Sequence, residues 1–295
     1  MGSSCISAHF RGGVMPESSS FAICATLVTA ALGLLVGAVA SRCAWAWARG
    51  HSTRTAAFRC GSCGRPLALN PLAHRCPTCG ERISMRGPSE AVLAVAWATL
   101  LWRFGPSPEL AQMAALAVIL LMLSLTDLLA YVIPNWAIVA AIVVRLAYIA
   151  LAGARGTADD AWLLLGSLAS AVAITLPLVL LTLLMDRALG RDSLGGGDVK
   201  LFFATGLYFG LGQGLLVVAL SCLLGLVFHG LLLLAGRLRA PRGEPPAGEG
   251  RAPAADAPAE VPPHAFPFGP AIACACWVVA LLGPSMMDWY LSLLA

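Results

Sequence analysis

The chain has 295 residues, of which 59% are hydrophobic and only 12% are charged, and its mean hydropathy is +0.81. A soluble domain of this length cannot bury so much apolar surface, so a soluble protein is excluded. The net charge of +4 is small and gives no indication of nucleic-acid binding. The composition therefore predicts an all-α polytopic membrane protein.

Eight apolar segments follow one another, most of them near or above the roughly 20 residues that cross a bilayer core. They are 21–41, 90–104, 108–126, 133–153, 160–185, 199–212, 213–236 and 268–294. The second and sixth are short, so they are expected to be re-entrant or covered by neighbouring helices. This order predicts an N-terminal tail (1–20), a first transmembrane helix (21–41), a cytoplasmic domain (42–89), a membrane core (90–236), a disordered Pro/Ala/Gly/Glu-rich linker (237–267) and a last transmembrane helix (268–295).

The lysines and arginines indicate the orientation of these segments. If the N-terminus lies outside and eight helices alternate, 15 of the 19 basic residues fall on the cytoplasmic side, all except Arg11, Arg103, Arg145 and Arg155. Cytoplasmic loops carry such an excess of positive charge. We therefore expect both ends of the chain outside and the two large loops in the cytoplasm. Arg145 lies within the fourth segment and is expected to snorkel toward the outer face.

Four cysteines in the cytoplasmic domain have the spacing of a metal site. The stretch "CGSCGRPLALNPLAHRCPTCG" arranges them as C-x2-C-x12-C-x2-C, namely Cys60, Cys63, Cys76 and Cys79. Two such pairs supply four thiolates to a tetrahedral zinc ion, and a glycine after each pair allows a tight turn. A reducing compartment argues against disulfides. We predict a structural zinc site, and the alternative is a set of redox-active or inert thiols.

Two aspartates stand at the ends of apolar segments, where a charge is costly unless it has a function. Asp127 ends the third segment in "LMLSLTDLLAYVIPNW", and Asp198 begins the sixth in "SLGGGDVKLFF". In the predicted topology both lie at the cytoplasmic interface. Two carboxylates that share one water can divide the roles of general base and general acid, which is the chemistry of an aspartic peptidase.

The residues around the two acids fit the same chemistry. Gly195, Gly196 and Gly197 let the backbone approach an extended substrate strand and offer amides to it. Pro134, followed by Asn135, prevents the helix of Asp127 from continuing. Lys200 is read as a charge partner, a substrate contact or an interfacial anchor. Glu90 is read as a helix cap or a substrate contact, and the cap is favoured. The competing interpretation of Asp198 is likewise a plain helix cap.

Together these residues resemble the bacterial type IV prepilin leader peptidases, a family of GxGD aspartic membrane peptidases. The run from Gly195 to Asp198, followed by Lys200, is similar to the family's G-G-G-D-x-K. Asp127 with Pro134 and Asn135 resembles its D-x6-P-[DN]. The stretch "FPFGPAIA" (266–273) is similar to the P-F-G-P with which the family's last helix starts, and the paired cysteines resemble its cytoplasmic domain.

The resemblance implies an endopeptidase of the bacterial inner membrane that removes the basic leader from type IV prepilins or type II secretion pseudopilins at the cytoplasmic face. Asp127 and Asp198 would be its catalytic residues. It further implies N-methylation of the new N-terminus with S-adenosylmethionine, to which we assign no residues. Two other functions stay open: a proton- or cation-coupled transporter whose acids bind the cation, and a zinc-containing membrane scaffold of a secretion system.

Overall fold

The computed structural model describes residues 19–50, 58–60, 62–67, 73–84, 89–156, 159–190, 195–238 and 267–294. Most of the predicted tail (1–18) and linker (239–266) lies outside these ranges. Within them the chain forms helices and two isolated β-bridges. The helices are α1 (Ser19–Ala48), α3 (Ser89–Phe104), α4 (Pro108–Ala130), α5 (Asn135–Ala154), α6 (Asp160–Leu189), α7 (Gly196–Leu238) and α8 (Gly269–Leu294).

The predicted all-α membrane fold is confirmed. Six of the described helices are long and apolar enough to cross a bilayer, all except the 16-residue α3. Each of the eight predicted segments is largely helical, but the sixth and seventh both belong to α7, so the separation predicted between 212 and 213 is instead a bend at Gly210. Gly210 has φ 70° and ψ −178°, a conformation that only glycine adopts readily.

The bend folds α7 back on itself. A Cβ atom placed on Gly214 would lie 4.0 Å from the Cα of Gly206. Eight residues of straight helix would separate these positions by about 12 Å. The first leg of α7, which carries Asp198, therefore packs against the start of the second leg.

Local sequence signals fix both ends of α4. Ser107 accepts a hydrogen bond from the Leu110 amide at 3.2 Å, and Pro108 occupies the first turn, where its missing N–H costs nothing. At the other end Tyr131 adopts the left-handed conformation with φ 54°, and its amide donates to the Asp127 carbonyl at 2.8 Å. The chain then leaves the helical direction before Pro134. Asp127 thus lies in the last turn of α4.

Small residues let α1 and α3 approach closely. A Cβ atom on Gly33 would meet the Cα of Ala94 at 2.8 Å, and one on Gly37 would meet the Cα of Glu90 at 2.9 Å. These glycines form a G-x3-G pattern, which membrane helices use to pack backbone against backbone. Glu90 lies in the first turn of α3 and is buried in this contact near Arg42.

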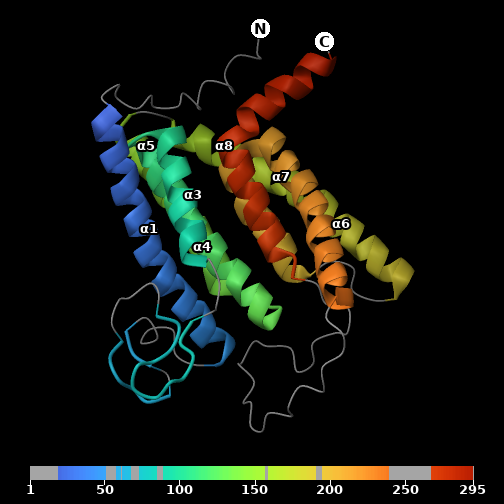
Figure 1. The fold of residues 1–295 in the computed structure, drawn as a ribbon. Coiled ribbons are helices and arrows are strands. Elements are labelled where there is room, and N and C mark those ends of the chain that lie inside the picture. The colour runs from blue at the N-terminus through green and yellow to red at the C-terminus, as the bar shows by residue number, and fades with distance from the viewer. Residues whose placement is uncertain are drawn as a thin grey trace.

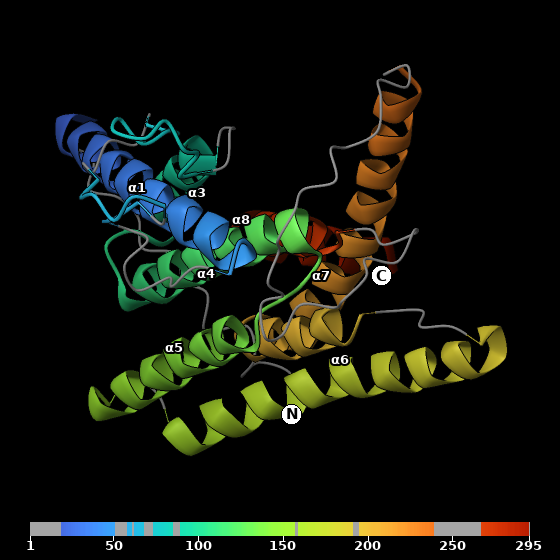
Figure 2. The same cartoon turned by 90° about the horizontal axis from the view of Figure 1, so that it is seen from below.

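The main apolar core joins α3, α4, α5, α7 and α8 with one side of α6. Figure 2 shows α6 along the edge of the bundle. Only 11% of the most apolar window of α6 is buried, so most of its surface is available to lipid.

The prediction that Arg145 snorkels is wrong. Its side chain is buried between helices, and its guanidinium donates to Gln112 Oε1 of α4 at 3.1 Å and to Ser167 Oγ of α6 at 3.0 Å. It also lies over the rings of Tyr148 and Tyr208, at 5.4 and 5.7 Å. Polar partners inside the bundle replace the water that snorkelling would reach.

The elements that carry the predicted chemistry gather at one end of the bundle. Figure 1 shows the end of α4, the first turn of α8 and the cysteine loop below α1 toward the lower end. The beginning of α1 and the end of α8 lie at the upper end. The end of α4, which carries Asp127, and the cysteine loop therefore lie at the same end of the bundle.

Candidate active site and metal centre

Asp127 is held by the last helix of the chain. Its side chain is only 6% exposed, and its Oδ2 atom accepts a hydrogen bond from the backbone amide of Gly269 at 2.7 Å. Gly269 is the first residue of α8, where backbone amides have no partner within the helix. The bond joins residues 142 positions apart, and it leaves the second carboxylate oxygen of Asp127 for other partners.

Asp198 lies in the first turn of α7. The two carboxylates are near enough for the charge of one to act on the other. Within the described ranges, the Asp198 carboxylate accepts no hydrogen bond from a backbone amide. A helix cap would show such a bond, so the geometry favours the functional interpretation of Asp198.

The three glycines before Asp198 have different surroundings. A Cβ on Gly195 would lie 2.9 Å from Oδ2 of Asp198, and one on Gly197 would lie 3.0 Å from Cβ of Ile133. A Cβ on Gly196 would meet nothing within 4 Å. Two of the glycines thus allow close packing around the acid, while Gly196 faces open space.

The segment between α4 and α5 contacts the same turn of α7. Lys200 Nζ donates to Asn135 Oδ1 at 3.1 Å, and Pro134 precedes the first turn of α5. Lys200 is exposed, and its partner is the neutral amide of Asn135. Its hydrogen bond therefore links the start of α7 to the start of α5. The structure therefore places the start of α5, with Pro134 and Asn135, beside the first turn of α7, which carries Asp198 and Lys200.

Backbone strain occurs at the same place. Among the non-glycine residues that the structure describes, Tyr131 alone has a positive φ. This conformation costs an ordinary residue about 1 kcal/mol, and such strain is concentrated at functional sites. Tyr131 ends the helix four residues after Asp127, so it keeps the chain from covering the acid with another helical turn.

Gly269 is the site residue that the sequence prediction missed. Its motif was noted as the start of the last helix, but nothing local showed that its amide binds Asp127. Phe268 next to it packs edge-on against Phe202 of α7, with ring centroids 6.4 Å apart. A G-P pair that starts an apolar helix is a usable signal, because the unpaired amides of such a helix start favour a carboxylate.

The four predicted cysteines come together in two matching turns. In each turn a glycine amide donates to the carbonyl of the first cysteine at 2.9 Å, from Gly64 to Cys60 and from Gly80 to Cys76. Both glycines have positive φ, of 67° and 72°. The isolated bridges Arg59–Pro66 and Arg75–Arg82 close the two turns.

The four sulfurs have the spacing of a tetrahedral metal site. Their Sγ atoms all lie within 4.8 Å of one another, and the Cys60–Cys79 and Cys63–Cys76 pairs are both 3.7 Å apart. Metal–sulfur bonds of ~2.3 Å in a tetrahedron give sulfur–sulfur edges of about 3.8 Å. His74 is bonded to Ser84 Oγ through Nδ1 at 2.8 Å and is not part of the cluster. The residues present can hold a metal ion.

The environments of the thiols also suit a cation. Backbone amides of Cys79 and Thr78 at the Cys76 sulfur lower the pKa of this thiol to about 6. At Cys79 the backbone amide of Glu81 lowers the pKa of the thiol. Burial and the neighbouring sulfurs outweigh this effect and raise the pKa to about 12. Four sulfurs this close cannot all ionise alone, and a divalent cation would remove that conflict.

Comparison with known proteins gives a family match over the region of both aspartates. The model of the type IV leader peptidase family matches residues 114–230. A relative from Bacillus subtilis (strain 168), named prepilin leader peptidase/N-methyltransferase, is 28% identical over 221 residues, which cover 74% of this chain and 75% of the relative. One of the same name from Aeromonas salmonicida (strain A449) is 32% identical over 104 residues, 35% of this chain and 28% of the relative. No solved structure matches.

Proposed function

We propose that this chain is a type IV leader peptidase and that Asp127 and Asp198 are the catalytic pair of a membrane aspartic endopeptidase, because the model of that family matches the region that holds both aspartates. The observation that carries this proposal is the meeting of the two acids, one from the end of α4 and one from the start of α7. A structural role would not require acids from separate helices to approach each other, since like charges repel.

In the proposed reaction one carboxylate accepts a proton from a water molecule held between the pair. The protonated partner donates to the carbonyl oxygen of the scissile peptide, and the water oxygen attacks its carbon. The carboxyl group that took the water proton then donates it to the peptide nitrogen, the C–N bond breaks, and the proton on the former carbonyl oxygen returns to the other carboxylate. The Gly269 amide fixes one oxygen of Asp127 and so orients the other toward the water. The two acids act as a pair, so neither is assigned the role of base.

The substrate peptide must be extended, because a helical peptide bond is shielded by its own backbone. We propose that its strand approaches the chain at Gly196, where no side chain stands in the way. The tie from Lys200 to Asn135 then keeps the start of α7 in place against α5.

We propose precursors of type IV pilins or type II secretion pseudopilins as substrates, cut at the cytoplasmic face of the bacterial inner membrane. The names of the relatives support leader removal and N-methylation. The methyl donor implied by that name is S-adenosylmethionine, and we assign it no residues of this chain. We further propose the domain division given above, with 42–89 as the metal-binding part and 90–236 as the main part of the peptidase.

We propose that the ion held by the four cysteines is zinc and that it is structural. Four thiolates complete a tetrahedral shell, so no position is left for water or substrate. The two cysteine turns pack together through a small apolar cluster of Cys60, Leu67, Cys76 and Ile83. A bound zinc ion would add four bonds that hold the two turns together.

Replacing Cys76 by serine is expected to remove the zinc and loosen this domain. Elemental analysis of the wild-type protein should give one zinc per chain, and C76S should give nearly none. Limited proteolysis should then cut C76S within the cysteine domain while the membrane helices stay intact, because they fold without the metal. Cys24→Ser, a change at an exposed position of α1, is the matched control and should retain the zinc. Full zinc in C76S would contradict the proposed site.

The proposed function is tested by mixing the purified protein in lipid with a prepilin precursor, with and without S-adenosylmethionine, and weighing the products. We expect a mature pilin whose mass corresponds to loss of the leader, and a further gain of one methyl group only when the donor is present. An intact precursor after prolonged incubation would contradict the peptidase proposal, whereas cleavage without methyl addition would contradict only the second activity.

A further inference from the structure

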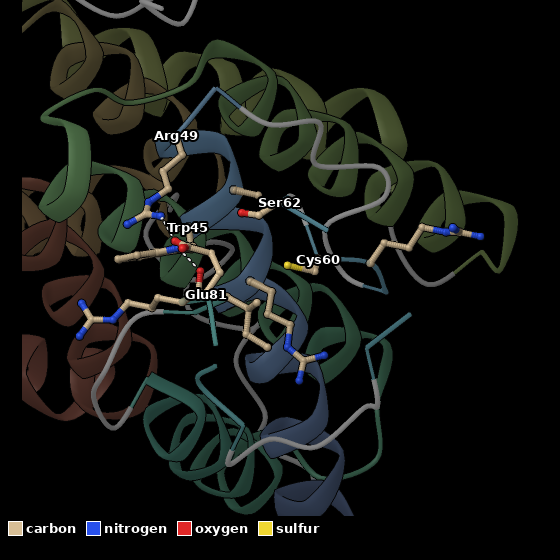
Figure 3. Close-up of a pocket in the computed structure, with 10 residues that line it drawn as sticks. Trp45, Arg49, Cys60, Ser62 and Glu81 are labelled. Carbon is tan, nitrogen blue, oxygen red and sulfur yellow. Dashed lines mark hydrogen bonds and ion pairs between the residues drawn. The ribbon is translucent and has the colours of Figure 1, made fainter. Parts of the chain in front are cut away.

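A basic pocket lies where the end of α1 meets the two cysteine turns (Figure 3). It is a shallow pocket that is partly open to solvent. The charged residues of its lining are four arginines and one glutamate, namely Arg42, Arg49, Arg59, Arg82 and Glu81. Trp45 of α1 and Cys60 of the metal cluster also line the pocket.

Arg42 is buried near Glu90, so the positive charge that faces the pocket comes from Arg49, Arg59 and Arg82, against the single carboxylate of Glu81. Glu81 is already engaged, because its Oε1 atom accepts from Arg49 at 2.7 Å. Arg59 donates to the Gly64 carbonyl at 3.3 Å, and Arg82 lies over the Trp45 ring at 5.4 Å and makes no ion pair with a carboxylate of the described residues. A guanidinium has five N–H donors, so each retains donors for a further partner. An oxyanion with several acceptor oxygens is the ligand chemistry that this arrangement fits.

Contacts with Trp45 hold two of the pocket arginines, Arg49 and Arg82, in place. Trp45 Nε1 donates to the Arg82 carbonyl at 2.9 Å, and Arg49 lies over the same ring system at 4.4 Å. These contacts fix the cysteine domain to the last turns of α1. The arginines are therefore held in position before a ligand arrives, which lowers the entropy cost of binding.

The position of the pocket indicates where the anion comes from. The apolar span of α1 ends at Ala48, and Trp45 and Arg49 lie at its end, at the level where aromatic and basic residues meet lipid headgroups. Basic pockets at the ends of membrane helices bind the phosphates of anionic lipids. We propose that this pocket binds the phosphate group of an anionic membrane phospholipid, a role separate from peptide cleavage.

The two cysteine turns offer a matched pair of variants. Arg59 and Arg75 occupy equivalent positions, since they donate to Gly64 and Gly80 at the equivalent places in the two turns. Arg59 lines the pocket and Arg75 does not. If the arginines only offset the negative charge of a metal–thiolate centre, replacing Arg59 and replacing Arg75 should have the same effect. If they bind a lipid phosphate, only the replacement of Arg59 should weaken lipid binding.

The test uses the full-length, zinc-loaded protein in phosphatidylcholine nanodiscs that contain a minor fraction of phosphatidylglycerol. Native mass spectrometry then counts the two lipids that stay bound. Wild-type protein should retain phosphatidylglycerol preferentially. Arg59→Gln and Arg82→Gln should each weaken its retention by about tenfold, the loss expected for one charge-assisted hydrogen bond. Arg75→Gln should stay within about twofold of wild type, and all variants should retain zinc.

Three results would overturn the proposal. The first is equal retention of the two lipids by the wild-type protein. The second is a loss in R75Q as large as in R59Q, or loss of zinc from R82Q, which would make the arginines part of the metal centre. The third is displacement of phosphatidylglycerol by an equimolar amount of inorganic phosphate, which would make the ligand a dissolved anion. None of these results bears on peptide cleavage, so the two proposals fail separately.

Discussion

Asp127→Asn and Asp198→Asn are each expected to lower the rate of leader cleavage by about 10³-fold or more, with the protein still folded and inserted. Each amide lacks the proton-transfer capacity of the acid that it replaces, and general acid–base catalysis contributes roughly 10²–10⁴-fold for one group. The D127N side chain keeps an oxygen that can accept from the Gly269 amide, so the geometry of the site is retained. The rate is measured by mass spectrometry of the products under single-turnover conditions.

A matched control comes from the other end of the last helix. Asp288 is an exposed acid of α8, and Asp288→Asn makes the same chemical change away from the site. It should cleave at the wild-type rate. Wild-type cleavage by either site variant would remove that aspartate from the catalytic pair, and unfolding of both would be detected by thermal denaturation before any rate is interpreted.

Gly269→Ala is expected to lower the rate of the cleavage step by about 10²-fold. The added methyl group would lie 2.9 Å from Oδ2 and 3.2 Å from Cβ of Asp127, so the carboxylate must move. A displacement of about 1 Å at a reacting group has a cost of this size. The effect should fall on kcat, with a much smaller change in KM, because the substrate strand is not expected to contact Gly269.

Gly166→Ala serves as the control for this change. Gly166 lies in α6, and a methyl group there would meet nothing within 4 Å. The variant should be as active and as stable as the wild type or slightly more stable, since alanine favours a helix over glycine. An unchanged kcat in G269A would show that the bond between Gly269 and Asp127 does not position the acid.

The parts of the site that could be predicted from the sequence are those formed by short motifs. The spacing of the four cysteines and the glycine run before Asp198 each lie within a few tens of residues, so chemistry and local geometry can be read together. The eight apolar segments predicted the membrane fold because burial in lipid depends on composition. The third segment even placed Asp127 correctly in the last turn of its helix.

The remaining features depend on contacts between distant segments. Arg145 had only the sequence cue of a charge in an apolar helix, and its partners Gln112 and Ser167 belong to two other helices. The arginines of the pocket were read as a signal of orientation, which their number supports. Their convergence on Trp45 depends on how the cysteine domain packs against α1. The bend at Gly210 could not be predicted from the sequence for a different reason. Glycine is also common in straight membrane helices, so its presence does not indicate a bend.

The bond from Gly269 to Asp127 has a consequence for the timing of activity. During synthesis α4 and the first leg of α7 emerge from the ribosome well before α8, so both acids are in the membrane while the amide that orients Asp127 is still missing. The nascent chain therefore holds an unfinished protease next to the translocon, where other hydrophobic segments pass. Cleavage by such a chain is expected to be slower until α8 has been inserted and its first amide binds Asp127.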